Sequence, residues 1–335
     1  MTPRRALLAA PALLFAPPAG AQAPSAAPQR SGAAWPERPL RLVIPFVPGG
    51  TTDILGRLLA QTMGPRLGQT VVVENRGGAG GSLGAGEVAH ARPDGYSMLL
   101  STNGSLTINP LVQANLAYEP FRQLAPLGLC LTVPMLIVVR ADHPARTIQD
   151  YVALSKARPG AVSMGSAGTG SSNHLALELF NAASQAQATH VPYRGSGPMI
   201  ADLLAGNLNS MMDQITTSLA MAQEGRVRAL AITDNHRSRL LPNVPTLAEA
   251  GFPEAEMVTF MGLSATAPLP AEAEARLVPA MRAALQEPIF HDRLEGAGAE
   301  IVRGELCTPA GYGAFLRRDF DKMKRAVQLA GLKPE

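Results

Sequence analysis

At 335 residues, the chain is longer than one hydrophobic core usually serves, so two domains are expected. Hydrophobic residues make up 46% of the chain and charged residues 16%, which is typical of a folded globular protein and excludes a disordered one. Aromatic residues are only 4% of the chain, which argues against a platform that stacks nucleic-acid bases.

The first 23 residues have the pattern of an export signal. The chain begins with the positively charged MTPRR, residues 6–16 form a short apolar core, and AQA at 21–23 has the small-x-small form of a cleavage site. The apolar run is too short to span a membrane. We therefore expect a signal peptide at 1–23 and a linker rich in Pro, Ala and Ser at 24–37. The adjacent arginines leave both the Sec and the twin-arginine export routes open.

Removal of the signal also changes the charge balance. It takes away two arginines and no acidic residue, so 27 basic side chains remain against 26 acidic ones. This near-neutral balance leaves no basic patch for DNA or an anionic membrane, and no nucleic-acid partner is expected. Cys130 and Cys307 lie far apart in the sequence, and the spacing does not decide whether they pair.

Strand patterns and helix patterns alternate in the first part of the mature chain. Strand-like runs lie at 41–47, 69–75 and 96–102, and residues 54–68 and 82–91 have apolar residues at helical spacing. This β-α-β-α-β order predicts an α/β domain with a mostly parallel sheet.

The alternation restarts after a long apolar stretch at 127–140, which suits a strand that runs from one domain into another. A second domain follows, and residues 260–270 resemble a return crossing. Residues 271–295 and 309–330 are then mostly helical. One α/β domain interrupted by another is the plan of binding proteins that close about a hinge. The pattern in the second domain comprises helices near 147–157, 173–184, 198–205 and 217–224, and strands near 161–166, 189–193, 208–214 and 228–234.

Two similar turns stand at equivalent places in the two halves. Residues 42–60 and 162–180 both run from a strand through a Gly/Ser/Thr turn into an amphipathic helix. Backbone N–H groups at a helix N-terminus, with Thr or Ser hydroxyls, can bind a carboxylate without a fixed cation. One such turn alone indicates ordinary helix capping, but two turns in an exported two-lobed protein favour an anion site.

Three kinds of chemistry are poorly supported. The turn after Gly50 lacks the lysine of a phosphate-binding loop, and no complete dinucleotide-binding glycine pattern is present. A GxSxG pattern at 80–84 places Ser82 as a hydrolase nucleophile, but residues 75–79 separate this pattern from the strand run TVVVE. His174 and Glu178, at i and i+4, indicate a surface or capping contact. We therefore expect no metal, no cofactor and no catalytic residue.

Several motifs together resemble the Bug family of periplasmic solute-binding proteins, which serve tripartite tricarboxylate transporters. They occur in order as PFVPGGTTD, VVVENRGGAGGSLGA, PDGYSMLL, SAGTGSSNHLALELF, HVPYRGSGPMIADLLAG, RALAITDNHRS and LPNVPTLAEAG. The resemblance implies a two-lobed periplasmic binding protein fold of the type II-like α/β class. Each lobe would be a mostly parallel sheet flanked by helices, and the ligand cleft would lie between the lobes. Lobe 1 would comprise 38–135 plus 265–335, and lobe 2 would comprise 136–264.

The resemblance also implies a set of ligand-binding residues on the two walls of the cleft. Asp53 is open to two interpretations, a group that binds a ligand ammonium or a helix cap. Arg194 is either a clamp for a second carboxylate or a surface charge. From the first lobe the implied residues are Phe46, Pro48, Gly50, Thr51, Thr52, Asp53, Gly78, Ala79, Thr102 and Asn103, and from the second lobe Ala167, Thr169, Ser171, His174, Tyr193, Arg194 and Asp213.

The sequence thus predicts a periplasmic, monomeric, non-catalytic receptor. It would capture a small organic acid or acidic amino acid and deliver it to membrane subunits of a tripartite tricarboxylate-type transporter. Two alternatives stay open: an exported serine hydrolase that uses Ser82, and a ligand-sensing partner of a membrane signalling system.

Overall fold

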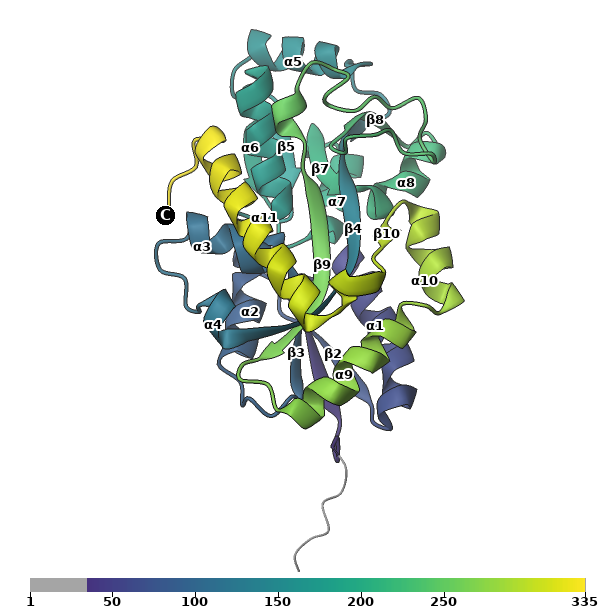
Figure 1. The fold of residues 1–335 in the computed structure, drawn as a ribbon. Coiled ribbons are helices and arrows are strands. Elements are labelled where there is room, and N and C mark those ends of the chain that lie inside the picture. The colour runs from purple at the N-terminus through teal and green to yellow at the C-terminus, as the bar shows by residue number, and fades with distance from the viewer. Residues whose placement is uncertain (1–34, 335) are drawn as a thin grey trace, which may run out of the picture. The chain divides into compact units, whose positions relative to one another are not determined.

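Strands and helices alternate along residues 35–334, the part of the chain that the computed structural model describes (Figure 1). The predicted signal peptide and residues 24–34 of the predicted linker lie outside this range. The described strands are β1 (Leu40–Ile44), β2 (Val71–Asn75), β3 (Ser97–Thr102), β4 (Leu124–Arg140), β5 (Ser163–Ser166), β6 (Thr189–Pro192), β7 (Ser210–Gln214), β8 (Val227–Ile232), β9 (Val258–Thr266) and β10 (Glu300–Ile301).

The helices lie mostly where the apolar spacing predicts them. Residues 104–126 carry additional short helices that have no clear periodic pattern. The α-helices are α1 (Thr51–Leu67), α2 (Ser82–Ala89), α3 (Asn109–Val112), α4 (Pro120–Gln123), α5 (Ile148–Ala157), α6 (Ser172–Ser184), α7 (Ser196–Ala205), α8 (Ile215–Gln223), α9 (Ala271–Ala284), α10 (Pro288–Arg293) and α11 (Pro309–Leu329). None of the described helices combines the length and the apolar character needed to cross a membrane.

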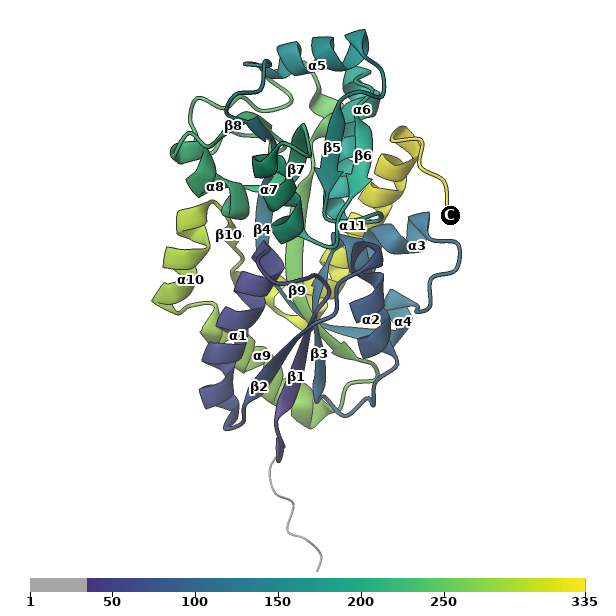
Figure 2. The same ribbon diagram turned by 180° about the vertical axis from the view of Figure 1, so that it is seen from behind.

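Two groups of parallel strands form the two lobes. In the first lobe β1 pairs in parallel with β2 and β3, and in the second lobe β5 pairs in parallel with β6 and β7. Figure 2 shows the two groups at opposite ends of β4 and β9. Because the carboxyl ends of parallel strands meet at one edge of a sheet, the turns that follow β1 and β5 are placed to line a common site.

The strands β4 and β9 join the two groups through antiparallel pairs. The strand order is β2-β1-β3-β9-β4-β7-β5-β6. Residues 124–134 of β4 pair with β9, and β4 then pairs from Met135 onward with β7 and from Leu136 with β8. The two-lobed α/β fold predicted from the sequence is confirmed, with parallel pairing in the outer strands and antiparallel pairing around β4 and β9. The lobe boundaries at 135/136 and 264/265 stay predictions.

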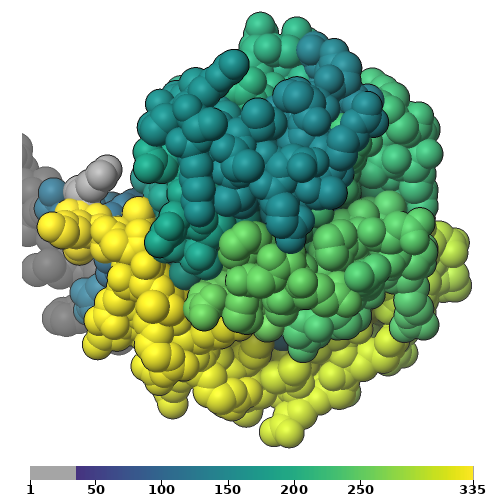
Figure 3. Space-filling model, turned by 90° about the horizontal axis from the view of Figure 1, so that it is seen from above, coloured from purple at the N-terminus to yellow at the C-terminus, as the bar shows by residue number. Residues whose placement is uncertain are grey.

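The last long helix, α11, packs against both lobes. Tyr312 and Leu316 in its first half belong to an apolar cluster with Val43 and Leu99 of the first lobe. Met323, Ala326 and Val327 in its second half belong to a cluster with Phe180 and Met212 of the second lobe. In Figure 3, which views the end of the second lobe, the C-terminal segment lies along one side of the surface. Cys130 and Cys307 are both buried free thiols in a third cluster.

Candidate functional site

A small cavity lies between the turns of the two lobes. Its volume is about 330 Å³, part of which is open to solvent, and its walls stand close together. Hydroxyl groups, amides, glycine backbone and three apolar side chains form the walls, and no charged side chain lines it. The lining residues are Phe46, Gly50, Thr52, Thr102, Ala167, Ser172, Asn173, Gly195, Ser196, Gln214, Thr259 and Met261.

The first turn, residues 45–53, connects β1 to α1 and is held by a network of charged and amide groups. Gly50 is the N-cap residue and makes no side-chain cap, and Asp53 lies in the first turn of the helix. Its carboxylate accepts from the Gly49 amide at 3.2 Å and from Asn75 Nδ2 at 3.0 Å, and it pairs with Arg57 at 3.0 Å. Burial acts to raise the pKa of Asp53, but these bonds together lower it below its usual value.

Thr51 and Thr52, at the start of α1, have different surroundings. Thr52 lines the cavity. The Thr51 hydroxyl instead donates to Gln214 Oε1 at 3.2 Å and lies 2.5 Å from the Thr216 hydroxyl, across from the end of β7. Thr51 therefore connects the first turn to the second lobe and orients Gln214, which lines the cavity.

The second turn, residues 167–174, connects β5 to α6 and is held by neutral groups. The Ser171 hydroxyl caps α6 by accepting from the His174 amide at 3.2 Å. The Gly170 amide donates to His174 Nδ1 at 3.2 Å, and the Gly168 amide donates to the Ser166 hydroxyl at 3.1 Å. The His174 ring supports the turn from behind, because it is buried and does not line the cavity.

Two imidazoles stack beneath this turn. The ring centroids of His174 and His190 are 4.1 Å apart. Burial lowers the pKa of His174 to about 3, with a smaller contribution from the charge of His190, and burial lowers the pKa of His190 to about 4. Both rings are therefore neutral near pH 7, which leaves His174 Nδ1 free to accept from the Gly170 amide.

A buried carboxylate positions one of the cavity hydroxyls. Asp213 is fully buried and accepts from the hydroxyls of Ser196 at 2.7 Å, Thr217 at 2.6 Å and Ser218 at 2.7 Å. Burial raises the pKa of Asp213, and the three hydroxyl bonds partly oppose that shift. Because Ser196 lines the cavity and Asp213 does not, the carboxylate acts on the cavity through Ser196.

The glycine segment, residues 77–81, meets the second turn backbone to backbone. A Cβ at Gly80 would lie 2.3 Å from the Thr169 carbonyl oxygen, a distance that real Cβ atoms do not reach. Asn109 Nδ2 donates to the Gly80 carbonyl at 3.2 Å, and Gln113 Nε2 donates to the Ala79 carbonyl at 3.1 Å. Only glycine at position 80 permits this close approach of the two lobes.

With this geometry established, the chain can be compared with known proteins. Residues 55–332 match the model of the family described as the tripartite tricarboxylate transporter family receptor, TctC. The chain belongs to the TctC receptor family. Its resemblance to Bug proteins is confirmed by the solved structure of the periplasmic binding protein BugD. BugD is 36% identical and has a TM-score of 0.86, with 90% of this chain and 100% of BugD covered.

Two further structures similar to this receptor contain ligands. The MatC protein of Rhodopseudomonas palustris, with bound malate, is 31% identical with a TM-score of 0.84, over 88% of this chain and 100% of MatC. Another Rhodopseudomonas palustris protein, with adipate, is 32% identical with a TM-score of 0.84, over 90% of this chain and 100% of that protein. The TctC family consists of periplasmic solute-binding proteins, so the prediction of a binding protein rather than an enzyme is confirmed.

The hydrolase alternative also lacks its geometry. Ser82 is the first residue of α2 and is mostly buried. A hydrolytic serine needs a base within hydrogen-bond reach, and within residues 35–334 no histidine hydrogen-bonds to the Ser82 hydroxyl.

The structure brings part of the predicted ligand set to the cavity of the receptor. Phe46, Gly50, Thr52, Thr102 and Ala167 line it. The roles of all the predicted residues stay predictions. The members that do not line the cavity are Pro48, Thr51, Asp53, Gly78, Ala79, Asn103, Thr169, Ser171, His174, Tyr193, Arg194 and Asp213.

Several of these residues bond to other parts of the protein. Tyr193 donates its hydroxyl to Asp202 at 2.8 Å, and the Arg194 side chain is exposed. Asn103 accepts from the Phe260 amide at 2.8 Å. Seven lining residues lie outside the predicted ligand set, although one of them, Ser172, belongs to the Gly/Ser/Thr turn that the sequence indicates. The positions of Gln214 at the junction of β7 and α8 and of Ser196 at the start of α7 were usable signals. The seven residues are Ser172, Asn173, Gly195, Ser196, Gln214, Thr259 and Met261.

Proposed function

We propose that this receptor captures a small organic acid with one or more carboxylates and delivers it to a tripartite tricarboxylate-type transporter. The single observation that carries the proposal is the cavity wall. It combines the starts of α1 and α6 with the hydroxyls of Thr52, Ser172 and Ser196, and it has no charged side chain. Helix N-termini and neutral hydroxyls can bind a carboxylate without a fixed cation beside it.

The ligands of two similar receptors support this class of ligand. The MatC structure contains malate and a second Rhodopseudomonas palustris structure contains adipate, and both are dicarboxylates. The walls of the present cavity stand close together, so an acid can enter only when the lobes move apart. We infer that the lobes stand further apart when the acid enters and close on it by a bend of β4 and β9. The acid must then favour the closed arrangement over the open one.

The predicted export signal and the periplasmic family members support a periplasmic location. Delivery to a transporter can be tested with membrane vesicles that contain the membrane subunits of a tripartite tricarboxylate-type transporter. Uptake of a labelled acid should depend on added receptor. Uptake that proceeds equally well without the receptor would contradict the delivery role.

Ligand capture is tested with a thermal-shift screen of ligand-stripped receptor against malate, adipate, citrate, an aromatic acid and glutamate. A ligand at about 100 times its dissociation constant should stabilise the folded state by about 2.7 kcal/mol. If none of these acids raises the melting temperature at millimolar concentration, the carboxylate assignment fails.

A pair of threonine variants on α1 gives the matched comparison. Thr52→Val removes a cavity hydroxyl without changing the side-chain shape, and it should weaken acid binding roughly 10- to 100-fold because a bond to a charged group is worth about 1.5–3 kcal/mol. Thr62→Val removes a hydroxyl that bonds within the helix, to the Leu58 carbonyl at 2.7 Å, and should leave binding unchanged. Equal affinities in the two variants would exclude Thr52 from the binding site.

A further inference from the structure

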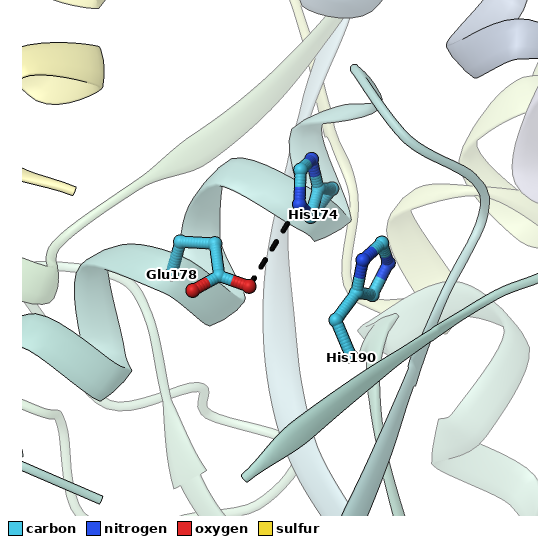
Figure 4. A group of neighbouring side chains, drawn as sticks. All are labelled: His174, Glu178 and His190. Carbon is cyan, nitrogen blue, oxygen red and sulfur yellow. Dashed lines mark ion pairs between the residues drawn. The ribbon is translucent and has the colours of Figure 1, made fainter. Parts of the chain in front are cut away.

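A cluster of two imidazoles and one carboxylate lies outside the cavity, beneath the second turn. His174 and Glu178 are one helical turn apart on α6, and His190 lies on the neighbouring strand β6. One potential ligand atom from each residue lies within 4.8 Å of the other two. Figure 4 shows the three side chains converging on one another. The sequence spacing of the first two indicates a surface or capping contact, and the surface interpretation is wrong because their side chains are only 8% and 22% exposed.

The ring nitrogens and the carboxylate of the cluster lie close together. His174 Nε2 lies 3.7 Å from Glu178 Oε1, beyond hydrogen-bond range. His190 Nε2 lies 2.6 Å from the Ser166 hydroxyl, so its Nδ1 is left for another partner. A hydroxyl that fixes the far side of an imidazole is a common way to orient a metal-binding ring.

We propose that His174 Nε2, His190 Nδ1 and a carboxylate oxygen of Glu178 bind a divalent transition-metal ion of the zinc class. Two imidazoles and one carboxylate are a ligand set that Zn²⁺ uses when a water molecule occupies the fourth position. Imidazole ligands favour zinc, copper or nickel over magnesium and calcium. The half-buried Glu178 and His190 give an ion access from solvent.

The distances require only a small adjustment of side chains. Tetrahedral ligands at about 2.0–2.1 Å from zinc stand roughly 3.3 Å apart, so the widest separation in the cluster must shorten by about 1.5 Å. Glu178 can supply most of this movement, because its side chain has several rotatable bonds and is partly exposed.

Metal binding would act on the second turn through His174. In the metal-free protein His174 Nδ1 accepts from the Gly170 amide at 3.2 Å, so the ring proton is on Nε2. A metal ion on Nε2 takes the place of the proton there, and the neutral ring then carries its proton on Nδ1. The Nδ1–H group would point at the Gly170 N–H, and two donors cannot form a hydrogen bond. The bond to Gly170 is lost and the turn must shift. Ala167 and Ser172 flank this bond and line the cavity.

The metal and the organic acid should therefore weaken each other's binding by the same factor. This coupling rests on the proposed function, whereas the metal site itself does not. The site is tested without any organic acid, by titrating the metal-free full chain with Zn²⁺ in a calorimeter and with Co²⁺ by visible absorption. We expect one ion per chain and the intense absorption bands of tetrahedral cobalt.

Three variants separate this cluster from adventitious binding. Glu178→Gln and His190→Gln each keep roughly the size of the side chain. Each should weaken zinc binding by at least about 10-fold, because even the loss of a residue that only hydrogen-bonds to a metal ligand costs about that much. His236→Gln changes an exposed histidine near Glu300 and should leave zinc binding unchanged. The site is overturned if the wild type binds no zinc, if the double variant Glu178→Gln/His190→Gln binds as tightly, or if His236→Gln abolishes binding.

The effect on the second turn has its own readout. Zinc added without organic acid should move the amide resonance of Gly170 in an ¹⁵N spectrum, while the amide of Gly225, in a surface turn, should stay in place. An unmoved Gly170 resonance in zinc-saturated protein would overturn the coupling. Because neither measurement uses an organic acid, a failed acid screen leaves the metal result standing, and a failed zinc titration leaves the acid screen standing.

Discussion

The first turn, residues 45–53, and the second turn, residues 167–174, face the same cavity but are stabilised by different chemistry. In the first turn an ionised carboxylate, Asp53, gathers the Gly49 amide, Asn75 and Arg57. In the second turn a hydroxyl, Ser171, caps the helix, and a neutral imidazole, His174, accepts from Gly170. The two lobes therefore present similar backbone to a ligand over supports that respond differently to protons and metals.

This difference assigns separate tasks to the two turns. The partners of the Asp53 carboxylate all belong to the first lobe, and their bonds lower the pKa of Asp53. The support of the second turn depends on His174 Nδ1, which gains a proton either on acidification or when a metal binds Nε2 of the same ring. We infer that the first turn is a fixed wall and that the second turn is the part of the site open to regulation.

The largest expected effect comes from the glycine at which the two lobes meet. Gly80→Ala places a Cβ against the Thr169 carbonyl, and overpacking of this kind costs about 1–3 kcal/mol in the closed arrangement. Organic acid affinity should fall roughly 10- to 100-fold, measured by calorimetry. Gly86→Ala, on α2 with room for the methyl group, should bind normally. Unchanged affinity in Gly80→Ala would show that the glycine segment and the second turn need not approach each other for binding.

Acid should destabilise the fold through His190, the ring that stacks on His174 beneath the second turn. His190 has a folded pKa of about 4 and an unfolded value of 6.5, so below pH 6.5 the unfolded chain binds a proton that the folded chain does not. The free energy of unfolding should fall by up to about 1.4 kcal/mol per pH unit between pH 6.5 and about 4 on account of this ring. Above pH 6.5 it contributes no pH dependence.

The contribution of His190 is isolated by comparing the wild type with His190→Gln in urea titrations across this window. Burial raises the pKa of Asp319 to about 6, so this group makes the folded state more stable as the pH falls. Asp319 is present in both proteins, so its contribution cancels when their stabilities are compared. The variant should lose less stability on acidification than the wild type. Parallel curves for the two proteins would mean that the ring is not the group that titrates.

A smaller effect is expected at the charged support of the first turn. Asp53→Asn should lower the free energy of unfolding by about 1 kcal/mol at pH 7, because it weakens bonds from Gly49 and Asn75. Because the pKa of Asp53 is lower in the folded state than in the unfolded chain, this stability is present above about pH 4. It disappears as the pH falls through the pKa of the folded state. Asp142→Asn, in an exposed pair with Arg140, should change stability by only a few tenths of a kcal/mol.

The same variant decides between the two interpretations of Asp53. A helix-capping group should leave the affinity for an acidic ligand unchanged when its charge is removed. If Asp53 lies beside the ligand, neutralising it should strengthen the binding of a carboxylate and weaken the binding of an ammonium group. Calorimetry with malate and with glutamate distinguishes these results.

The sequence was sufficient to predict the fold because the relevant signals are local. Periodic apolar residues define β1, α1, β5 and α6, and the long apolar run at 127–140 indicated the strand that joins the lobes. The resemblance to the Bug family led to five of the cavity-lining residues, among them Thr52 and Ala167.

The remaining features depend on the approach of distant segments. Ser196, Gln214 and Thr259 line the cavity from three different elements, and no local pattern connects them. The contact of Gly80 with Thr169 needs the folded distance between the lobes. Likewise, the i, i+4 spacing of His174 and Glu178 is visible in the sequence, but the arrival of His190 beside them follows from the pairing of β6 with β5.

The strand β4 bears on how the protein unfolds. Its 17 residues pair first with β9 and β10 and then with β7 and β8, so one continuous backbone belongs to both lobes. Neither lobe can lose its sheet without exposing part of the other's, and α11 packs against both. Melting of the two lobes is therefore expected to be a single cooperative event, with the amides at the centre of β4 exchanging last with solvent deuterium.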